Sequence, residues 1–403
     1  MEKAVALDDA DPLSSLREAF FLPEGVIYFD GNSLGAMPKA ALAAVDAAVQ
    51  QEWATDLITS WNKAGWFDLP TKYGDMLAPV IGAAPGEVVM CDSTSINLYK
   101  AVFAGLSLRP DRRKIIAEAD SFPTDLYMIE GALTARQGLE MAAVDNLLEA
   151  IDDQVAVVLL NHVDYRRGAV ADVAAITAKA HDVGAVVVLD LCHSAGIMPV
   201  GLNALKVDLA IGCTYKYLNG GPGAPAFIYC ASRHLPHVSQ PLSGWWGHAR
   251  PFAFDTTFTP DAGIRKFLCG TQPILSFRAL EASLSLFQGL DMAVVRAKAK
   301  SLTALFIELA EEQVPTLTLA APRNADARGA QVSFTHPHAF PIVQALIARG
   351  VVGDFRMPNV LRFGFSPLYL SHMDVVQAVR ILREIMASGE WQEARFNTRA
   401  AVT

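Results

Sequence analysis

The chain has 403 residues, of which 52% are hydrophobic and 19% are charged, so it can bury a large core and is not an intrinsically disordered protein. Its formal net charge is −9 and it contains no basic run, which argues against nucleic acid or an anionic membrane surface as a partner. No uncharged apolar stretch is long enough to span a bilayer, and the acidic segment 1–13 lacks the apolar core of a signal peptide, so we expect a cytoplasmic protein.

The N-terminal part of the chain predicts a short strand over 26–29, a glycine-rich turn and an alanine-rich helix over 39–53. From about residue 87 to residue 229, short runs rich in β-branched residues alternate with helical stretches such as 171–183. This alternation is typical of a mostly parallel sheet covered by helices, so we predict an α/β domain. Its predicted strands are 114–117, 155–160, 185–189, 209–213 and 226–229.

The C-terminal part begins with one or two long helices over 272–313, with a probable break at Gly289. A smaller α+β unit follows, for which we predict two strands and two helices. We divide the chain into an N-terminal segment 1–64 that joins the small domain, a large α/β domain 65–285 and a C-terminal small domain 286–403. The elements of the small unit are strands 331–335 and 360–363 and helices 341–349 and 373–386.

Asp190 and Lys216 carry the most specific chemical signal. Asp190 ends the apolar strand 185–189, and Lys216 follows the next predicted strand within Thr214-Tyr-Lys-Tyr-Leu-Asn-Gly-Gly-Pro-Gly223. Pyridoxal 5′-phosphate (PLP) chemistry needs this pair, because a lysine binds the cofactor as a Schiff base and an acid keeps its pyridine nitrogen protonated. The alternative, a solvated surface lysine near a turn, is disfavoured by the aspartate in register.

Several polar residues fall just past the ends of predicted strands, where open α/β sheets bind their ligands. They include Asn161 and the Asp190-Leu-Cys-His193 segment, and we expect them to converge with Lys216 on one crevice. A carboxylate at Asp190 would be costly unless it were paired, and a pyridinium N–H supplies that pairing. Taken alone, Asp190 could instead cap the next helix and His193 could be a core histidine.

Two further segments suit a phosphorylated aromatic cofactor. Thr94 and Ser95 precede an apolar helical stretch, and hydroxyls at a helix N-terminus make an anion site, although simple N-capping would look the same. Phe122, in Ser121-Phe-Pro-Thr-Asp125, is placed to stack on a planar ring, and the alternative is an ordinary turn with Phe122 in the core.

The last two chemical signals are aromatic and cationic. Trp245 and Trp246 lie between glycines and could donate an indole N–H to a phosphate or form an aryl pocket, or they could anchor the core or an interface. Arg362 lies in a predicted strand, where it suits either an amino-acid carboxylate or a structural salt bridge. The pair His336 and His338 lacks a third ligand, so we predict no metal site.

Taken together, these segments resemble the kynureninase family of fold-type I PLP enzymes. The resemblance rests on segments that run from near the start of the chain to its last fifth, in the family's order. They are Phe29-Asp-Gly-Asn-Ser-Leu-Gly35, Phe122-Pro-Thr-Asp125, Asp190-Leu-Cys-His193, the Lys216 segment, Gly244-Trp-Trp-Gly-His248 and Arg362-Phe-Gly-Phe-Ser-Pro367. It implies a large domain with a mostly parallel seven-stranded sheet between helices, a smaller α+β domain, and a homodimer with active sites built between subunits.

The resemblance also implies roles for individual residues. Lys216 binds the cofactor and acts as base, Asp190 pairs with the pyridine nitrogen, and Tyr215 is the expected proton donor. Arg362 is expected to bind the substrate carboxylate, with an aryl pocket from Trp66 and Trp246. The remaining cofactor contacts are Thr94, Ser95, Phe122, Pro123, Thr124, Asp125, Asn161, His193, Trp245 and Thr271, the last of which is expected to reach across the subunit interface.

The implied reaction is hydrolysis of L-kynurenine, and possibly of its 3-hydroxy form, to anthranilate and L-alanine. Two alternatives keep the same fold: a cysteine desulfurase or a class V aminotransferase. A desulfurase needs a nucleophilic cysteine on a mobile loop, and Cys269 is the one cysteine outside an apolar strand-like context. A third alternative, a PLP-binding regulator without activity, would be expected to lack the lysine or the aspartate.

Overall fold

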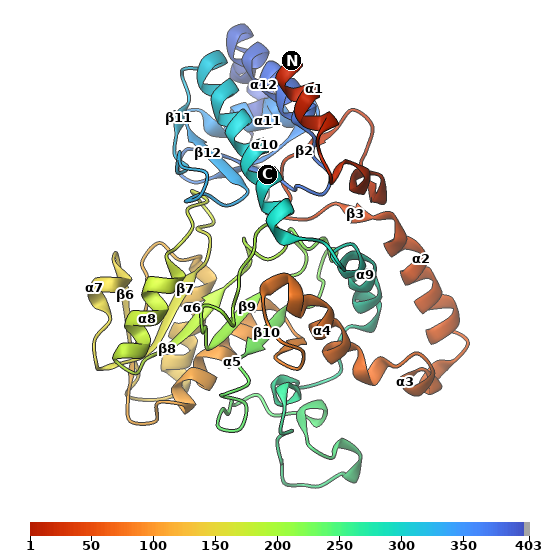
Figure 1. The fold of residues 1–403 in the computed structure, drawn as a ribbon, viewed down its shortest axis with the longest axis vertical. Coiled ribbons are helices and arrows are strands. Elements are labelled where there is room, and N and C mark those ends of the chain that lie inside the picture. Colours follow the sequence, from red (N-terminus) through yellow and green to blue (C-terminus); the bar gives the residue numbers. More distant parts are fainter. Residues whose placement is uncertain (399–403) are drawn as a thin grey trace.

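The computed structural model describes residues 1–398 and is built around a seven-stranded sheet (Figure 1). The strand order across this sheet is β4-β10-β9-β8-β7-β5-β6. All neighbouring strands are parallel except at β10, which runs antiparallel to both β4 and β9. The strands are β4 (Val88–Met90), β5 (Lys114–Glu118), β6 (Glu140–Val144), β7 (Val155–Asn161), β8 (Val186–Asp190), β9 (Leu209–Gly212) and β10 (Phe227–Cys230).

Helices cover both faces of this sheet, which explains why its central strands are apolar throughout. Along β8, Val187 and Leu189 enter one hydrophobic cluster, whereas Val186 and Val188 enter the other, as the alternation of a strand requires. The second cluster includes α5 (Thr94–Ser107) and α6 (Pro123–Ala135). The first includes α4 (Leu69–Ile81), α8 (Val173–Asp182) and α9 (Ile274–Ser285).

A second, smaller unit lies at the other end of the molecule, at the top of Figure 1. Its four-stranded sheet has the order β11-β12-β15-β14 and is fully antiparallel. The strands are β11 (Thr318–Leu319), β12 (Gln331–Thr335), β14 (Asp354–Arg356) and β15 (Val360–Gly364), and the helices are α10 (Met292–Gln313), α11 (Ala339–Ala348) and α12 (His372–Ser388).

The N-terminal segment is attached to this smaller unit. Strand β2 (Ile27–Tyr28) pairs in parallel with β13 (Val351–Val352), and the backbone N–H of Gly364 donates to the carbonyl of Phe29 at 2.7 Å. Helix α1 (Glu2–Asp9) packs against α12, and the two lie side by side in Figure 1. The short strands β1 (Phe20–Phe21) and β3 (Met37–Pro38) form a separate pair.

The predicted fold class is confirmed, and most predicted elements lie within two or three residues of the observed ones. Helix α2 (Lys39–Ala47) continues as a π-helical turn over Ala48–Trp53, and Gly289 separates α9 from α10 in a left-handed conformation (φ +76°). The boundaries 1–64, 65–285 and 286–403 stay a prediction. Among residues 1–398, no helix is long and apolar enough to cross a membrane. The short helices are α3 (Ser60–Lys63) and α7 (Leu147–Ala150).

Candidate active site

A cavity of about 210 Å³ opens at the carboxyl ends of the parallel strands. Its walls come from the loops after β4, β5, β7, β8 and β9, where ligands of open α/β sheets bind. The cavity brings together ten of the residues expected from the sequence. It is lined by Thr94, Ser95, Phe122, Thr124, Asp125, Asn161, Val163, Tyr165, Asp190, Cys192, His193, Tyr215 and Lys216.

Lys216 lies at the centre of these contacts. Its Nζ is 3.0 Å from Nε2 of His193 and 6.0 Å from the centroid of the Phe122 ring. Burial, and then the positive charge of Lys216, hold the pKa of His193 well below its usual range, so this imidazole is neutral. Nδ1 of His193 is buried and has no hydrogen-bond partner among the described residues. A ligand in the cavity could provide that partner.

The backbone around Lys216 is held by close contacts. The carbonyl of Tyr215 accepts a hydrogen bond from the N–H of Gly35 at 2.7 Å. A Cβ at position 35 would lie 2.2 Å from the carbonyl oxygen of Lys216, so only glycine fits this approach. The Asp-Gly-Asn-Ser-Leu-Gly loop of the N-terminal segment therefore packs directly on the lysine segment.

Asp190 and Asp125 form a buried pair of carboxyl groups on neighbouring loops. The N–H of Cys192 donates to Oδ1 of Asp190 at 2.6 Å, and Nδ2 of Asn161 donates to Oδ2 of Asp125 at 2.8 Å. Burial, and then the charge of Asp190, raise the pKa of Asp125 well above its usual value. Burial likewise raises the pKa of Asp190, against the opposing effect of the Cys192 N–H. Two neighbouring buried carboxyls favour a cation beside them, and the N–H of a protonated pyridine ring would supply that positive charge.

The start of α5 suits a phosphate group. Ser93 is the N-cap, and its hydroxyl accepts a hydrogen bond from the N–H of Ile96 at 3.4 Å. Thr94 and Ser95 are the first helical residues, and both line the cavity. Capping and anion binding therefore fall to different residues, and the first-turn N–H groups with two hydroxyls make an anion site.

Phe122 is 42% exposed and forms one wall of the cavity. Its ring meets that of Tyr165 edge to face, with centroids 5.1 Å apart. Pro123 follows as the first residue of α6, and Phe122 is the N-cap position of that helix. A large exposed aromatic side chain that borders a cavity is suited to stack on a planar ligand.

The predicted tryptophans do not line this cavity. Trp246 is fully buried, and its indole N–H donates to the carbonyl of Phe67 at 3.2 Å. Trp245 stacks on Trp246 with centroids 5.2 Å apart, and the Trp66 indole donates to Oε2 of Glu52 at 2.7 Å. Thr271 is exposed and is not one of the residues that line the cavity. The roles predicted for these residues stay predictions.

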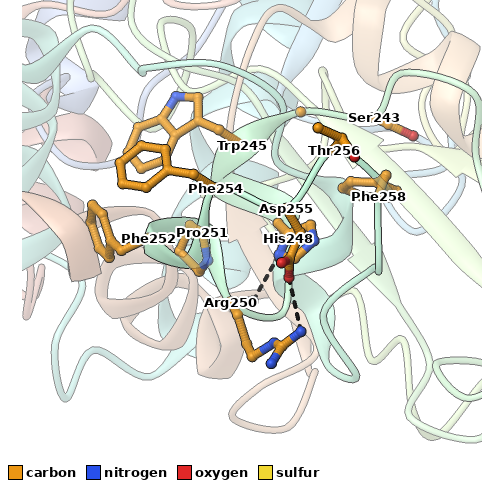
Figure 2. A pocket seen from close by; sticks show the side chains of 11 residues that line it. Ser243, Trp245, His248, Arg250, Pro251, Phe252, Phe254, Asp255, Thr256 and Phe258 are labelled. Carbon is orange, nitrogen blue, oxygen red and sulfur yellow. Dashed lines mark hydrogen bonds and ion pairs between the residues drawn. The ribbon is translucent and has the colours of Figure 1, made fainter.

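Trp245 instead lines a second and larger cavity of about 510 Å³, which Figure 2 shows from close by. This cavity is formed by the loop 243–258, and the ring of Trp245 lies beside that of Phe252, with centroids 6.1 Å apart. Phe252 is 66% exposed and Phe254 is 84% exposed. Arg250 and Asp255 form an ion pair at 2.8 Å on the opposite side of the loop.

Arg362 is paired within the protein. The side chain is 2% exposed, and its Nε and Nη2 atoms both donate to the carboxylate of Asp354, at 2.7 Å for Nε. Nη1 donates to the carbonyl of Tyr165 at 2.7 Å, and Nη2 also donates to the Ser33 hydroxyl at 2.9 Å. Because Tyr165 lines the cavity, Arg362 lies behind one of the cavity walls. The carboxylate-binding role of Arg362 stays a prediction.

Several site residues were not identified from the sequence. Tyr165 and Val163 line the cavity, although the only signal for them is their position shortly after strand β7. Asp354, the partner of Arg362, lies two residues before Arg356 in β14, and this Asp-x-Arg spacing was a usable signal. Among residues 1–398, no group of three or more His, Cys, Asp or Glu side chains could hold a metal ion.

The arrangement has clear structural counterparts. The apo cysteine desulfurase from Thermococcus onnurineus NA1 superposes with a TM-score of 0.78 at 22% identity, covering 93% of this chain and 98% of its own. A C-DES variant with glycine covalently linked to the PLP cofactor gives 0.78 at 19% identity, covering 91% and 99%. At these identities the likeness shows a shared fold, which is that of the fold-type I PLP-dependent enzymes.

The sequence comparisons identify the family within this class. A kynureninase from Burkholderia pseudomallei (strain 1106a) is 50% identical over 412 residues, which cover 100% of this chain and 99% of that protein. Residues 295–382 match the family model described as the kynureninase C-terminal domain. The chain belongs to the kynureninase family.

Proposed function

We propose that this protein is a PLP-dependent kynureninase that hydrolyses the Cβ–Cγ bond of L-kynurenine to give anthranilate and L-alanine. The observation that carries the proposal is the cavity in which Lys216, Asp190 and the start of α5 converge, in a chain 50% identical to a kynureninase over its full length. The same cavity fits the cofactor at three points: an amine, a carboxyl pair and an anion site. The same site would also hydrolyse 3-hydroxy-L-kynurenine, to 3-hydroxyanthranilate and L-alanine.

When bound, PLP supplies an electron sink for the pair released as Cα of the substrate loses its proton. The protein's own contribution begins with Lys216, whose Nζ takes that proton. His193, 3.0 Å away and neutral, orients the amine without competing for a positive charge. Asp190 holds the pyridine nitrogen protonated. Asn161 donates a hydrogen bond to Asp125, which lies beside Asp190 and supports its position. Thr94 and Ser95 hold the phosphate group, and Phe122 stacks on the ring.

Tyr215 suits the role of proton donor to Cβ. Burial, and then the charge of Cys213, raise the pKa of Tyr215 to about 12, so its phenol is protonated at neutral pH. Water adds to the γ-carbonyl carbon, the Cβ–Cγ bond breaks to release anthranilate, and Tyr215 donates the proton that completes the methyl group. Lys216 returns a proton to Cα to give L-alanine, and the proton released from the added water restores Tyr215. Arg362 binds the substrate carboxylate at the small-domain side, which fixes the orientation of Cα.

We further propose that the active unit is a cytoplasmic homodimer. The aromatic loop 243–258 and the exposed Thr271 support this, because two exposed phenylalanines beside an open cavity suit contact with a second copy better than contact with water. In such a dimer, the predicted site residues that do not line the cavity would contribute to an active site at the subunit interface. They are Thr271, Trp245, Trp66 and Trp246.

A product assay with two substrates tests the function. The PLP-loaded protein is offered L-kynurenine and L-cysteine in separate reactions, with anthranilate fluorescence and sulfide as the readouts. We expect anthranilate and alanine from the first reaction and no sulfide from the second. Sulfide release without anthranilate would instead support the desulfurase alternative, and would direct attention to Cys269, the one cysteine that is not fully buried.

A further inference from the structure

Arg356 and Arg362 lie together on the small-domain sheet, and Arg362 donates to the carbonyl of Tyr165, a residue that lines the active-site cavity. Asp354 and Arg356 lie on the same face of the edge strand β14, and Asp354 is directly opposite Arg362 on β15. Phe363, on the other face of the sheet, packs against Phe306 with ring centroids 4.9 Å apart. The polar face of this sheet thus carries the charges, and the apolar face carries the core.

Asp354 holds both guanidinium groups. Its side chain is 1% exposed, and Oδ2 forms an ion pair with Nη2 of Arg356 at 2.8 Å and accepts a hydrogen bond from Nη2 of Arg362. The Ser33 hydroxyl donates to the same oxygen at 2.8 Å. Because the carboxylate lies between two arginines and is closed off from water, it fixes the relative positions of both.

Arg362 has little capacity left for a ligand. A guanidinium has five N–H donors, and four of those on Arg362 already have acceptors in Asp354, Ser33 and the carbonyl of Tyr165. A two-pronged grip on a carboxylate needs two donors from one edge of the group. As arranged here, Arg362 can offer one.

Arg356 has the missing capacity. Its side chain is 34% exposed, compared with 2% for Arg362. Within residues 1–398, Arg356 donates hydrogen bonds to the carbonyl of Phe355 at 3.1 Å and to the Ser33 hydroxyl at 3.4 Å, and it forms an ion pair with Asp354. Its Nε and one Nη1 proton are left to donate.

The charge of Arg356 contributes to the electrostatics of the cavity-lining His193. Burial, followed by the charges of Lys216, Arg362 and Arg356, lowers the pKa of the cavity-lining His193. Burial and the neighbouring Asp354 raise the pKa of Asp30 to about 7, so near neutral pH this carboxyl is partly protonated. When Asp30 is protonated, Asp354 is the carboxylate that remains between the two guanidinium groups, which favours an anion nearby.

We propose that Arg356 is a second substrate-binding residue, which binds the α-carboxylate of the amino-acid substrate together with Arg362 while Asp354 positions both. The proposal rests on the proposed function, because it concerns the carboxylate of the substrate assigned there. It restricts the substrate class to amino acids with a free α-carboxylate, since a neutral group would leave two arginines without a counter-charge.

The test compares Arg356→Gln, Arg356→Lys and the control Arg380→Gln, all loaded with PLP. Arg380 is 57% exposed and, among residues 1–398, forms its ion pair with Glu384 on α12, so it controls for loss of a surface charge. Two quantities are measured: the KM and kcat for L-kynurenine, and the dissociation constant of L-alanine from the change in the cofactor absorbance. L-alanine carries the carboxylate but no aryl group, so its binding isolates this contact.

We expect Arg356→Gln to raise both the KM and the L-alanine constant by about 10- to 100-fold, the range of a charged hydrogen bond, with kcat within about threefold. Arg356→Lys keeps the charge but loses the fork, so it should fall between Gln and the unsubstituted protein. Arg380→Gln should leave both constants unchanged.

Constants within twofold of the unsubstituted protein in both Arg356 variants would overturn the proposal. So would a loss of kcat at unchanged KM and L-alanine affinity, which would mean that Arg356 only supports the sheet. If Arg356→Gln fails to fold or to hold PLP, Arg356→Lys decides by the same criterion. If the unsubstituted protein binds L-alanine but does not cleave L-kynurenine, the proposed function fails while the L-alanine titration still decides the role of Arg356.

Discussion

The amine of Lys216 lies 3.0 Å from Nε2 of His193, and this contact joins the loops after two neighbouring parallel strands, β8 and β9. We expect Lys216→Ala to lower turnover of L-kynurenine by about 10³-fold or more, because no other amine lines the cavity among the described residues. Lys179→Ala, at an exposed position of α8, is the control and should retain full activity. Anthranilate fluorescence measures both variants, and residual turnover above one tenth in Lys216→Ala would contradict the assignment.

The two buried aspartates should respond differently to the same isosteric change. Burial, and then the charge of Asp190, raise the pKa of Asp125 well above its usual value, which favours its protonated form, and an amide resembles that form. We expect Asp190→Asn to lower kcat by about 100-fold or more, and Asp125→Asn to lower it by less than about tenfold. Steady-state rates at saturating PLP test this order, and equal losses in the two variants would show that Asp125 is ionised in the working enzyme.

Gly35 is predicted to be essential for the lysine segment. A Cβ there would lie 2.2 Å from the Lys216 carbonyl oxygen and 2.5 Å from Oδ1 of Asn219, so Gly35→Ala must displace one of the two loops. We expect a lower Tm and a loss of kcat, with about 2 kcal/mol or more of destabilisation. Gly131→Ala is the matched control, because a Cβ at this position of α6 meets nothing within 4 Å and should stabilise the helix slightly. A Gly35→Ala variant as stable and active as Gly131→Ala would refute the close approach.

Asp208 organises a polar cluster on the side of the sheet opposite the active site. Although burial opposes it, hydrogen bonds from His181 and His234, at 2.9 Å and 2.7 Å, hold the pKa of Asp208 well below its ordinary value. A carboxyl with a depressed folded-state pKa stabilises the fold above its unfolded pKa of about 4, and this contribution is lost as the pH falls towards the folded value.

We therefore expect Asp208→Asn to lower the Tm at pH 7 by an amount that corresponds to about 2–4 kcal/mol. Below pH 4 the Tm difference between the two proteins should narrow steadily, because Asp208 becomes protonated in the unfolded state while it stays ionised in the folded state. Thermal unfolding from pH 7 to pH 3 measures this. A Tm difference that stays constant with pH would mean that the cluster contributes through packing instead of charge.

The aromatic loop should report on assembly. Phe254 is 84% exposed and has a left-handed backbone (φ +54°). Both the exposed apolar ring and this backbone conformation are unfavourable in an isolated subunit. If the loop contacts a second copy, Phe254→Ser should weaken the dimer by about tenfold or more, as measured by sedimentation across a concentration series. Met37→Ser, at 44% exposure on strand β3, is a control for loss of exposed apolar surface elsewhere. An unchanged sedimentation profile for Phe254→Ser would remove the loop from the interface.

Much of the fold could be predicted from the sequence because its signals are local. Buried parallel strands are apolar throughout, so β7 and β8 were predicted within one residue, and β12 was predicted with its observed bounds. Strand β6 was not predicted, because it is an edge strand with only partly buried residues and has no such run. The convergence of Asp190, His193 and Lys216 could also be predicted, because all three lie at or past strand ends and parallel strands bring their carboxyl ends to one edge of the sheet.

The rest of the site depends on long-range contacts that leave no local pattern. Nothing in the segment around Arg362 indicates that the Ser33 hydroxyl accepts a hydrogen bond from its guanidinium, because Ser33 comes from the other end of the chain. The contact of Gly35 with the Lys216 segment is of the same kind. The tryptophans are another case, since Trp246 has the expected sequence context of a binding residue but lies in the core against Phe67.

The central claim is that Lys216 and Asp190 hold PLP in a site that cleaves L-kynurenine. The most direct measurement is the absorbance and fluorescence of the PLP-reconstituted protein before and after L-kynurenine is added. The account predicts a visible band from the lysine-bound cofactor, then loss of kynurenine absorbance with equal growth of anthranilate fluorescence. A visible band without anthranilate would contradict the proposed reaction, and no band after reconstitution would contradict the assignment of Lys216 and Asp190 themselves.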